Sequence, residues 1–366
     1  MKLYDKTKID WNNLLFDKKQ LFWLILPIVI EQLLNSLMGM VDTMMVSTVG
    51  SAAISAVALV DSINNLVIQI FSAMAAGAAI ICSQFIGSGD NEGSSQTARQ
   101  VVLTVFVIAV SVSAVCLLGG ERLLLLIFGS VEDAVMRNAR SYFLITALSY
   151  PFLALFSAGA AFYRASGNAK FPTKVSVLSN VINVTGNALF LYGFHQGVAG
   201  AAFATLLARI FSTVVVFYCL RKPGQTIVVR DYLKIRPDMP LIVKIMAIGI
   251  PTGIENGMFQ FGKLAIASTV STMGTVAISA QAMTIVKPLV WVGAFGLPYG
   301  FRAAGDVRVP MVVSVCSMWF CRVGICVLLV RVFHFGLMAV WIGIFVDWIV
   351  RATVFSARFV RGKQME

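Results

Sequence analysis

Residues 164–172 read RASGNAKFP, and residues 302–310 repeat that pattern as RAAGDVRVP, a shift of 138 positions. The shared residues stand in the same order in both copies: Arg, Ala, Gly, Asn or Asp, Lys or Arg, and Pro. Each copy separates two apolar runs of about 20 residues, the length that crosses a bilayer as a helix. The same connection between membrane-length segments therefore occurs twice in one chain.

A second block recurs with a different shift. The first apolar run and the residues after it return 224 positions later, with Pro27, Glu31 and Gly50 recurring as Pro251, Glu255 and Gly274, and AISA at 53–56 recurring at 277–280. Two blocks that recur in the same order indicate an internal duplication, which is common in secondary transporters. The shifts of 224 and 138 differ by 86 residues, so the second half lacks about 86 residues between its two matched blocks.

Composition places the chain in a membrane. Of its 366 residues, 58% are hydrophobic and 13% are charged, and the mean hydropathy is +0.84. Soluble domains average about 45–50% apolar and about 25% charged residues. The composition therefore excludes a soluble enzyme, a nucleic-acid binder and a secreted module. Apolar runs predict ten spans, at 21–45, 52–84, 100–120, 141–163, 174–194, 198–220, 241–268, 276–299, 311–330 and 337–357.

The basic residues predict the orientation. Of the 29 Lys and Arg residues, 21 lie in the connections, chain ends and adjoining span ends on the side of the N-terminus, 4 lie on the opposite side and 4 lie deeper within spans. Because cytoplasmic connections are enriched in basic residues, we expect both termini in the cytoplasm of a multi-pass cell-membrane protein.

The missing residues predict two unequal halves. Mapped onto the first half, the gap removes most of the second span, all of the third and most of the fourth, and leaves one fused span at 276–299. We therefore expect an all-α integral membrane protein with an N-terminal lobe of six helices (1–220), a cytoplasmic linker (221–240) and a C-terminal lobe of about four helices (241–366).

Several motifs carry a resemblance to a known family. They are GMVDT at 39–43, the VG pair at 49–50, QFIG at 84–87 and the duplicated RAxG block. In this order they resemble the multidrug and toxic compound extrusion (MATE) family. The resemblance implies two six-helix lobes that face each other around a central cavity, and the exchange of organic cations for Na⁺ or H⁺. The chain departs from that pattern in its shortened C-terminal lobe.

Two polar stripes mark a candidate ion site. A carboxylate at mid-membrane depth costs roughly 3 kcal/mol, so such residues are functional candidates. Helical spacing places one stripe along the first span and another along the fifth. Neutral oxygens beside one acid suit a monovalent cation. The stripes consist of Glu31, Asn35, Met38 and Asp42 on the first span, and Ser176, Asn180, Asn183 and Asn187 on the fifth.

The resemblance implies the roles of four of these positions. Family members use a helix-one Asp (here Asp42), helix-five polar residues (here Asn183 and Asn187) and a helix-six Thr (here Thr205) as the ion and proton site. Together with Asn180 from the stripe, these are the candidate ligands. Many members carry Asp where this chain has Asn187. We expect no cofactor and no metal beyond a Na⁺ coupling ion at Asp42.

Other intramembrane charges allow two interpretations. Glu31, Asn35, Asp61 and Glu255 are candidates for lining a substrate cavity, with helix packing as the alternative. Asp347 and Arg351 are spaced for a local ion pair. Arg209 lies four residues after Thr205, where it would pair with an N-lobe acid.

The sequence thus predicts an ion-coupled (H⁺ or Na⁺) antiporter that exports amphipathic organic cations or drugs. A lipid-linked saccharide flippase of the same superfamily is an alternative, since Arg209, Lys263, Lys287 and Arg322 lie within spans. A non-transporting truncated remnant is another. The chain has no P-loop or catalytic triad pattern, which argues against an enzyme or an ATP-driven pump. The expected partners are membrane lipids and small organic cations, and no nucleic acid.

Overall fold

The structure is a computed structural model. It describes residues 41–128, 132–222, 224–229, 236–271, 306–333 and 336–360, together with Leu26, Ile30, Glu31, Leu34, Gly39, Pro298, Phe301 and Arg302. Every regular element in these residues is a helix. The predicted all-α class is therefore confirmed. The chain divides into two compact units, Leu14–Gly249 and Ile250–Glu366 with Met1–Asn13.

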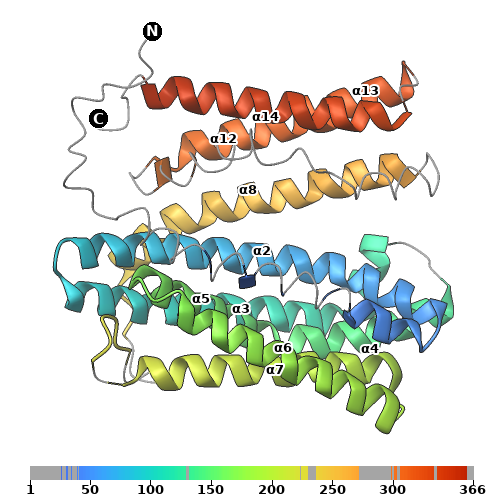
Figure 1. Cartoon of the computed structure of the whole chain (residues 1–366), viewed down its shortest axis with the longest axis horizontal. Helices are drawn as coiled ribbons and strands as arrows, with labels where there is room; N and C mark the ends of the chain where they lie inside the picture. Colours follow the sequence, from blue (N-terminus) through green and yellow to red (C-terminus); the bar gives the residue numbers. More distant parts are fainter. Residues whose placement is uncertain are drawn as a thin grey trace. The chain divides into compact units, whose positions relative to one another are not determined.

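The N-terminal unit is a bundle built around α2 (Ser51–Gly87), which packs against α3, α4 and α5 (Figure 1). Its buried face is rich in small residues, including Ala56, Gly77 and Ala78. Small residues let helix backbones approach closely, which is the main source of helix association in a bilayer. The other elements are α3 (Asn91–Phe128), α4 (Asp133–Leu148), α5 (Tyr150–Ala165), α6 (Lys170–Ala188), the π-helix η2 (Leu189–Gly193) and α7 (Gly197–Leu220).

The span predicted at 141–163 is longer than expected and broken. It consists of α4 and α5, which meet at Ser149 with a bend of 45°. Proline at 151 has no N–H to donate to the carbonyl of Ala147, so the helix cannot continue straight through this turn. Ser113 of α3 donates to that carbonyl instead, at 2.8 Å. The carbonyl that the bend leaves free is therefore hydrogen-bonded by a neighbouring helix.

The hydroxyl of Ser113 should therefore stabilise the bend. We expect Ser113→Ala to lower the free energy of unfolding by about 1–2 kcal/mol, since it leaves a buried carbonyl without a donor. Thermal unfolding of the detergent-solubilised protein measures the change. Ser111→Ala is the matched control, because the exposed Ser111 hydroxyl bonds only within its own helix. Equal melting temperatures for the two variants would contradict this account of the bend.

The C-terminal unit contains most of α8 (Met239–Ser271), α12 (Arg308–Cys316), the π-helix η5 (Ser317–Gly324), α13 (Ile325–Arg331) and α14 (Gly336–Val360). The helices α12 to α14 run alongside one another in Figure 1. A Cβ at Gly343 of α14 would lie 2.8 Å from the carbonyl oxygen of Arg322. Glycine therefore permits the close approach of α14 to η5.

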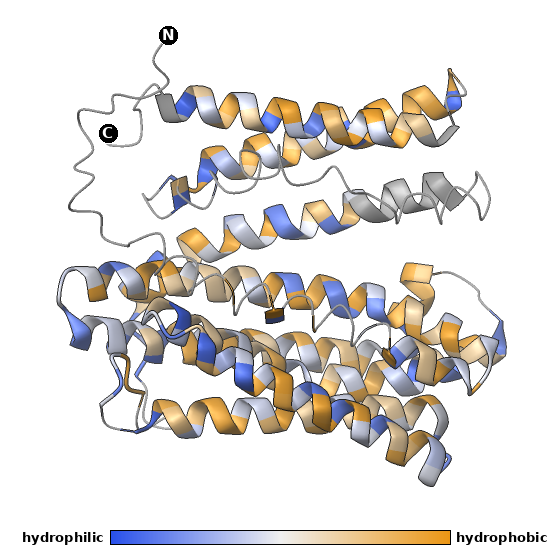
Figure 2. Cartoon of the chain, viewed as in Figure 1, coloured by the Kyte–Doolittle hydropathy of each residue, from blue (hydrophilic) through white to orange (hydrophobic). Residues whose placement is uncertain are grey.

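The described helices account for eight of the ten predicted spans. Seven are long and apolar enough to cross a membrane, and the bent pair α4 and α5 makes an eighth. Figure 2 shows hydrophobic residues along most of the length of these helices. The fused span predicted at 276–299 and most of the first span, 21–45, lie outside the described residues.

The described part of the predicted linker packs on the N-terminal unit. Ile227 and Val229 are buried, and the backbone N–H of Val228 donates to the hydroxyl of Ser95 at 3.2 Å. Gln100 of α3 donates to the carbonyl of Arg236 and accepts from the N–H of Asp238. This connection is therefore anchored to the start of α3 at several points.

Candidate functional site

Four of the predicted ion-site residues meet in the N-terminal unit. Asp42 lies in the helical residues 41–47, and its Oδ1 accepts a hydrogen bond from Asn187 Nδ2 at 2.7 Å. With the Asn183 amide nitrogen turned toward Asp42, that nitrogen donates to the same Oδ1 at 3.0 Å. The Asn183 oxygen then faces the hydroxyl and the backbone N–H of Thr205, at 3.1 and 3.3 Å. The structure thus joins the first and fifth spans at the Asp42 carboxylate, and Asn183 extends the connection to the sixth span.

The chemistry of this cluster suits a small cation or a proton. Asn183 and Asn187 are 7% and 1% exposed, so the carboxylate faces buried amides. The oxygen of Asn187 is buried without a hydrogen-bond partner among the described residues. A buried acceptor without a donor calls for a ligand. The Asp42 carboxylate, Asn187 Oδ1 and the Thr205 hydroxyl form the kind of oxygen set that a hard cation prefers, so a Na⁺ ion fits these residues.

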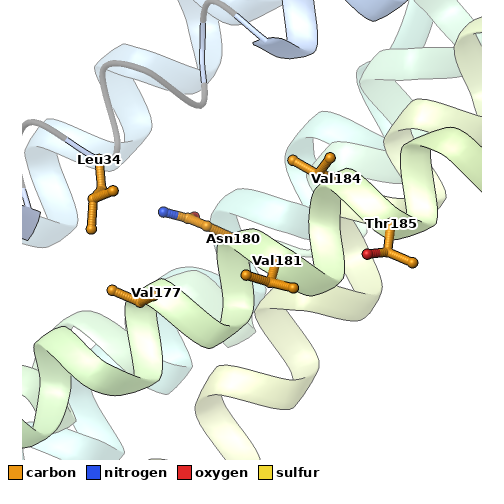
Figure 3. A pocket seen from close by; sticks show the side chains of 6 residues that line it. All are labelled: Leu34, Val177, Asn180, Val181, Val184 and Thr185. Atoms are coloured by element: carbon orange, nitrogen blue, oxygen red, sulfur yellow. The ribbon is translucent and has the colours of Figure 1, made fainter.

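Asn180 lies away from this cluster. It lines a cavity of about 260 Å³ whose wall otherwise consists of Leu34 and of apolar or hydroxyl residues of α6 (Figure 3). Its side chain extends toward Leu34 of the first span. The α6 residues are Val177, Val181, Val184 and Thr185. The predicted ligand Asn180 is thus placed at an apolar cavity one turn from Asn183. Asn35 lies outside the described residues.

Asp61 belongs to a second polar cluster in the same unit. Its Oδ1 accepts from Asn64 Nδ2 at 3.2 Å and from the hydroxyl of Tyr142 at 3.5 Å. The hydroxyl of Tyr150 donates to Asn64 Oδ1 at 2.8 Å. This second cluster thus connects α2 to both α4 and α5.

Sequence reasoning missed both tyrosines of this second cluster. Tyr142 lies in α4 and Tyr150 is the first residue of α5, on either side of the bend. Both hydroxyl groups donate to polar side chains of α2, Tyr142 to Asp61 and Tyr150 to Asn64. A tyrosine inside an apolar span needs a partner for its hydroxyl. That requirement was the available signal, but it does not say which helix supplies the partner.

Arg209 bonds to the bend rather than to an acid. Its Nη1 donates to the hydroxyl of Ser149 at 2.6 Å, and no ion pair of Arg209 within 4.0 Å is found among the described residues. Arg209 therefore contacts the hydroxyl of Ser149 instead of the N-lobe acid with which the sequence predicted an ion pair.

Glu31 and Glu255 form the same ion pair in the two units. Glu31 accepts from Arg164 at 2.9 Å and from the Thr173 hydroxyl at 3.3 Å. Glu255 pairs with Arg302. Glu255 repeats Glu31 with a shift of 224 residues, and Arg302 repeats Arg164 with a shift of 138. The pair thus links the two repeat blocks in each half, which supports a structural role for both glutamates.

The C-terminal unit holds a third charged cluster. The predicted pair of Asp347 and Arg351 is confirmed, with Arg351 Nε 2.7 Å from Asp347 Oδ1. A second cation was not expected there: Arg322 Nη2 lies 3.0 Å from Asp347 Oδ2. Ser317 also donates to Asp347. The sequence did not predict this contact because Arg322 belongs to a different span.

Comparison with known proteins identifies relatives over most of the chain. A family model described as MatE matches residues 27–189. The chain is 28% identical over 271 residues to an uncharacterized transporter, YisQ, of Bacillus subtilis, and the match covers 72% of this chain and 58% of YisQ. It is 23% identical to the probable multidrug resistance protein NorM of Thermotoga maritima, over 94% of this chain and 93% of that protein.

The fold is shared with solved structures. A crystal structure of a MATE protein in complex with MaD3S matches with a TM-score of 0.84 at 18% identity, covering 95% of this chain and 96% of that one. The match to the Thermotoga protein extends over 442 positions, more than the 366 residues of this chain. That relative therefore carries residues inside the matched region that have no counterpart here.

Proposed function

We propose that this chain, which is similar to the MATE transporters over most of its length, is an ion-coupled exporter of amphipathic organic cations. The observation that carries the proposal is the cluster of Asp42 with Asn183, Asn187 and Thr205. It links one ionisable group, the Asp42 carboxylate, to α6 directly and to α7 through Asn183. A group in that position can hold an ion and transmit its presence to the helices around it.

Exchange requires that the ion and the transported compound favour different states of the protein. A ligand shifts a conformational equilibrium only by its difference in affinity for the two states. When Asp42 is charged, it attracts a cationic compound. When H⁺ or Na⁺ occupies the cluster, that attraction is lost and the compound is released. Asn187 Oδ1, free of a protein donor in the described residues, would hold the Na⁺.

Transport into proteoliposomes tests this function. The purified protein is reconstituted, and a fluorescent organic cation is followed under an imposed proton gradient or an imposed Na⁺ gradient. We expect ion-driven movement under at least one gradient, abolished when that gradient is collapsed. The proposal would be contradicted if the dye moves at the same rate with and without either gradient. It would also be contradicted if the dye moves no faster than in empty vesicles.

The truncated-remnant alternative has its own test. Loss of two helices from a lobe exposes small-residue packing faces and removes one wall of a cavity. A twelve-helix relative has the block that this chain lacks. Inserting that block between Ala280 and Lys287 should then raise both the thermal stability and the efflux rate. If the native chain matches such a relative in both measurements, its short lobe is a working variant.

The proposed orientation places both termini in the cytoplasm of the cell membrane. In a cysteine-free background, we expect Gln196→Cys to react with an impermeant thiol reagent added to intact cells. Gln225→Cys is the matched control in the connection proposed to face the cytoplasm, and we expect it to react only after permeabilisation. Both side chains are exposed, so accessibility in the protein does not limit either reaction. The opposite labelling pattern would overturn the topology.

A further inference from the structure

The acids within the predicted spans fall into two kinds in the described structure. Three of them contact arginine side chains: Glu31, Glu255 and Asp347. The other two, Asp42 and Asp61, have no ion pair within 4.0 Å among the described residues and accept hydrogen bonds from neutral groups. An acid that loses its charge beside a buried arginine leaves an uncompensated cation, which is costly. Asp42 and Asp61 are therefore the acids that can gain or lose a proton without breaking an ion pair.

Asp61 lies deeper in the membrane than Asp42. It stands ten residues after Ser51, the first residue of α2, and therefore about 15 Å along the helix. The hydrocarbon core of a bilayer is about 30 Å thick, so Asp61 lies near its middle. Asp42 is five residues from the end of the helical residues 41–47, on the other side of the turn before α2. A bare carboxylate at mid-membrane depth costs roughly 3 kcal/mol, and a bound proton removes that cost.

The groups around Asp61 suit a proton better than a metal ion. Its Oδ1 accepts from Asn64 Nδ2 at 3.2 Å and from the hydroxyl of Tyr142 at 3.5 Å. Tyr150 in turn donates to Asn64 Oδ1, so all three hydrogen bonds are directed toward the carboxylate. A hard cation needs several oxygen acceptors, whereas these neighbours present hydrogens to Asp61. Its Oδ2 accepts no hydrogen bond from the described residues and is the atom that would hold the proton.

The helices packed against α2 bring one cation into this layer. The buried face of α3 has a thiol here, Cys116, and no charged residue. The helices α4 and α5 contribute the two neutral tyrosines. From α7 comes Arg209, which donates to Ser149, the residue before Tyr150. The first span carries Asp42, the other acid without an ion pair. Because Arg209 is held by a hydroxyl and not by Asp61, a proton can bind and leave Asp61 without breaking a salt bridge.

We propose that Asp61 binds a second proton, separate from the ion at Asp42, and that this proton is exchanged for the exported compound. The proposal rests on the proposed export function. A charged Asp61 adds to the negative charge that attracts an organic cation, and a protonated Asp61 does not. Because such coupling is reciprocal, binding of the compound releases the proton from Oδ2, and binding of the proton releases the compound. Each exported cation is then exchanged for one proton more than the ion at Asp42 accounts for.

Proton release on ligand binding tests the site without transport. Tetraphenylphosphonium, a permanent organic cation without a titratable group, is added to the purified protein in weakly buffered detergent solution. Bound cation and released protons are both counted, over the pH range in which the protein stays folded. We expect Asp61→Asn to release about one proton fewer per bound cation than the native protein at the pH of maximum release. Glu92→Gln is the matched control, because Glu92 is an exposed acid in the first turn of α3, and it should behave as the native protein does.

Infrared spectroscopy tests the same site without any ligand. The difference between spectra at acid and alkaline pH contains the C=O band of each carboxyl group that gains a proton. We expect this band to be weaker in Asp61→Asn than in the native protein and unchanged in Glu92→Gln. Asparagine resembles a protonated aspartic acid in shape and charge, and its oxygen can still accept both hydrogen bonds. The Asp61→Asn variant should therefore keep the native melting temperature.

The number of protons exchanged is measured in proteoliposomes at zero membrane potential, with equal Na⁺ on both sides. The pH difference that stops net movement of tetraphenylphosphonium against a tenfold gradient gives this number. If the native protein exchanges two protons, about half a pH unit suffices, and Asp61→Asn needs about one unit. If Na⁺ occupies Asp42, the native protein needs about one unit and Asp61→Asn does not respond to pH. In both cases the variant exchanges one proton fewer.

Several outcomes would overturn the proposal. One is the same proton release and the same infrared band in Asp61→Asn as in the native protein. Another is a loss of equal size in Glu92→Gln, because the effect would then not be specific to Asp61. A clear fall in the melting temperature of Asp61→Asn would mean that the fold requires the charged carboxylate, which also contradicts a site that is protonated in each cycle.

The proposal fails separately from the function on which it rests. If the native protein shows ion-driven efflux, but Asp61→Asn exchanges as many protons as the native protein does, the exporter stands and the second proton site falls. If tetraphenylphosphonium neither binds nor moves under any gradient, but the infrared band depends on Asp61, the export function fails and Asp61 stands as a proton-binding site.

Discussion

Asp42→Asn is expected to reduce ion-driven efflux to the level of empty vesicles while leaving the protein folded and inserted. The asparagine side chain has nearly the same shape, and its oxygen can still accept the hydrogen bond that Asn187 donates to Asp42. It cannot be protonated in the physiological range and carries no charge for a cation. The variant therefore loses the difference between ion-free and ion-bound states on which coupling depends.

The measurement is dye efflux from proteoliposomes under the gradient that drives the native protein, with melting temperature as the check on folding. Asp133→Asn is the control, because Asp133 is an exposed acid in the first turn of α4. Efflux by Asp42→Asn at the native rate would refute the role of this carboxylate. Loss of efflux in Asp133→Asn as well would show that the assay reports general damage.

Asp347→Asn is expected to lower the free energy of unfolding by about 3–5 kcal/mol, because removing one partner of a buried ion pair leaves uncompensated charge. Here it would leave two buried guanidinium groups without an acid. Unfolding of the detergent-solubilised protein measures the loss. Asp306→Asn is the control, since its pair with Arg358 is more exposed, with side-chain exposures of 17% and 27%. We expect a smaller loss there.

A double variant separates charge from packing at the same position. Asp347→Asn combined with Arg322→Gln has one unpaired guanidinium instead of two, so it should recover part of the lost stability. If Asp347→Asn is as stable as the native protein, or if the double variant is less stable than the single one, the charge balance described here is wrong.

The ion cluster shows how far spacing can predict a site. Helical periodicity placed Asp42 on one face of the first span, and Asn183 and Asn187 on one face of the fifth. The structure brings these faces together. Periodicity could not separate Asn180 from its neighbours, because it defines a face and not the height at which another helix meets it. Its role as an ion ligand stays a prediction, as do those of the other members.

The bend between α4 and α5 shows a different limit. Pro151 is visible in the sequence, but proline is tolerated in membrane helices when neighbouring groups satisfy the freed carbonyl. Whether the span bends, and by how much, depends on Ser113 of α3 and on Thr213 of α7, whose hydroxyl donates to the carbonyl of Phe152 at 2.7 Å. These contacts join residues far apart in the chain.

The sequence by itself determined the membrane class and the resemblance to the MATE transporters, because these follow from composition, from runs of fixed length and from motifs in order. It also determined the local ion pair of Asp347 with Arg351, whose members lie one helical turn apart. Only the tertiary structure decided that Arg322 joins this pair and that Glu255 meets Arg302. It also decided that Tyr142 reaches Asp61. The physical reason is that a partner on another helix is chosen by packing, and local spacing contains no information about which helices become neighbours.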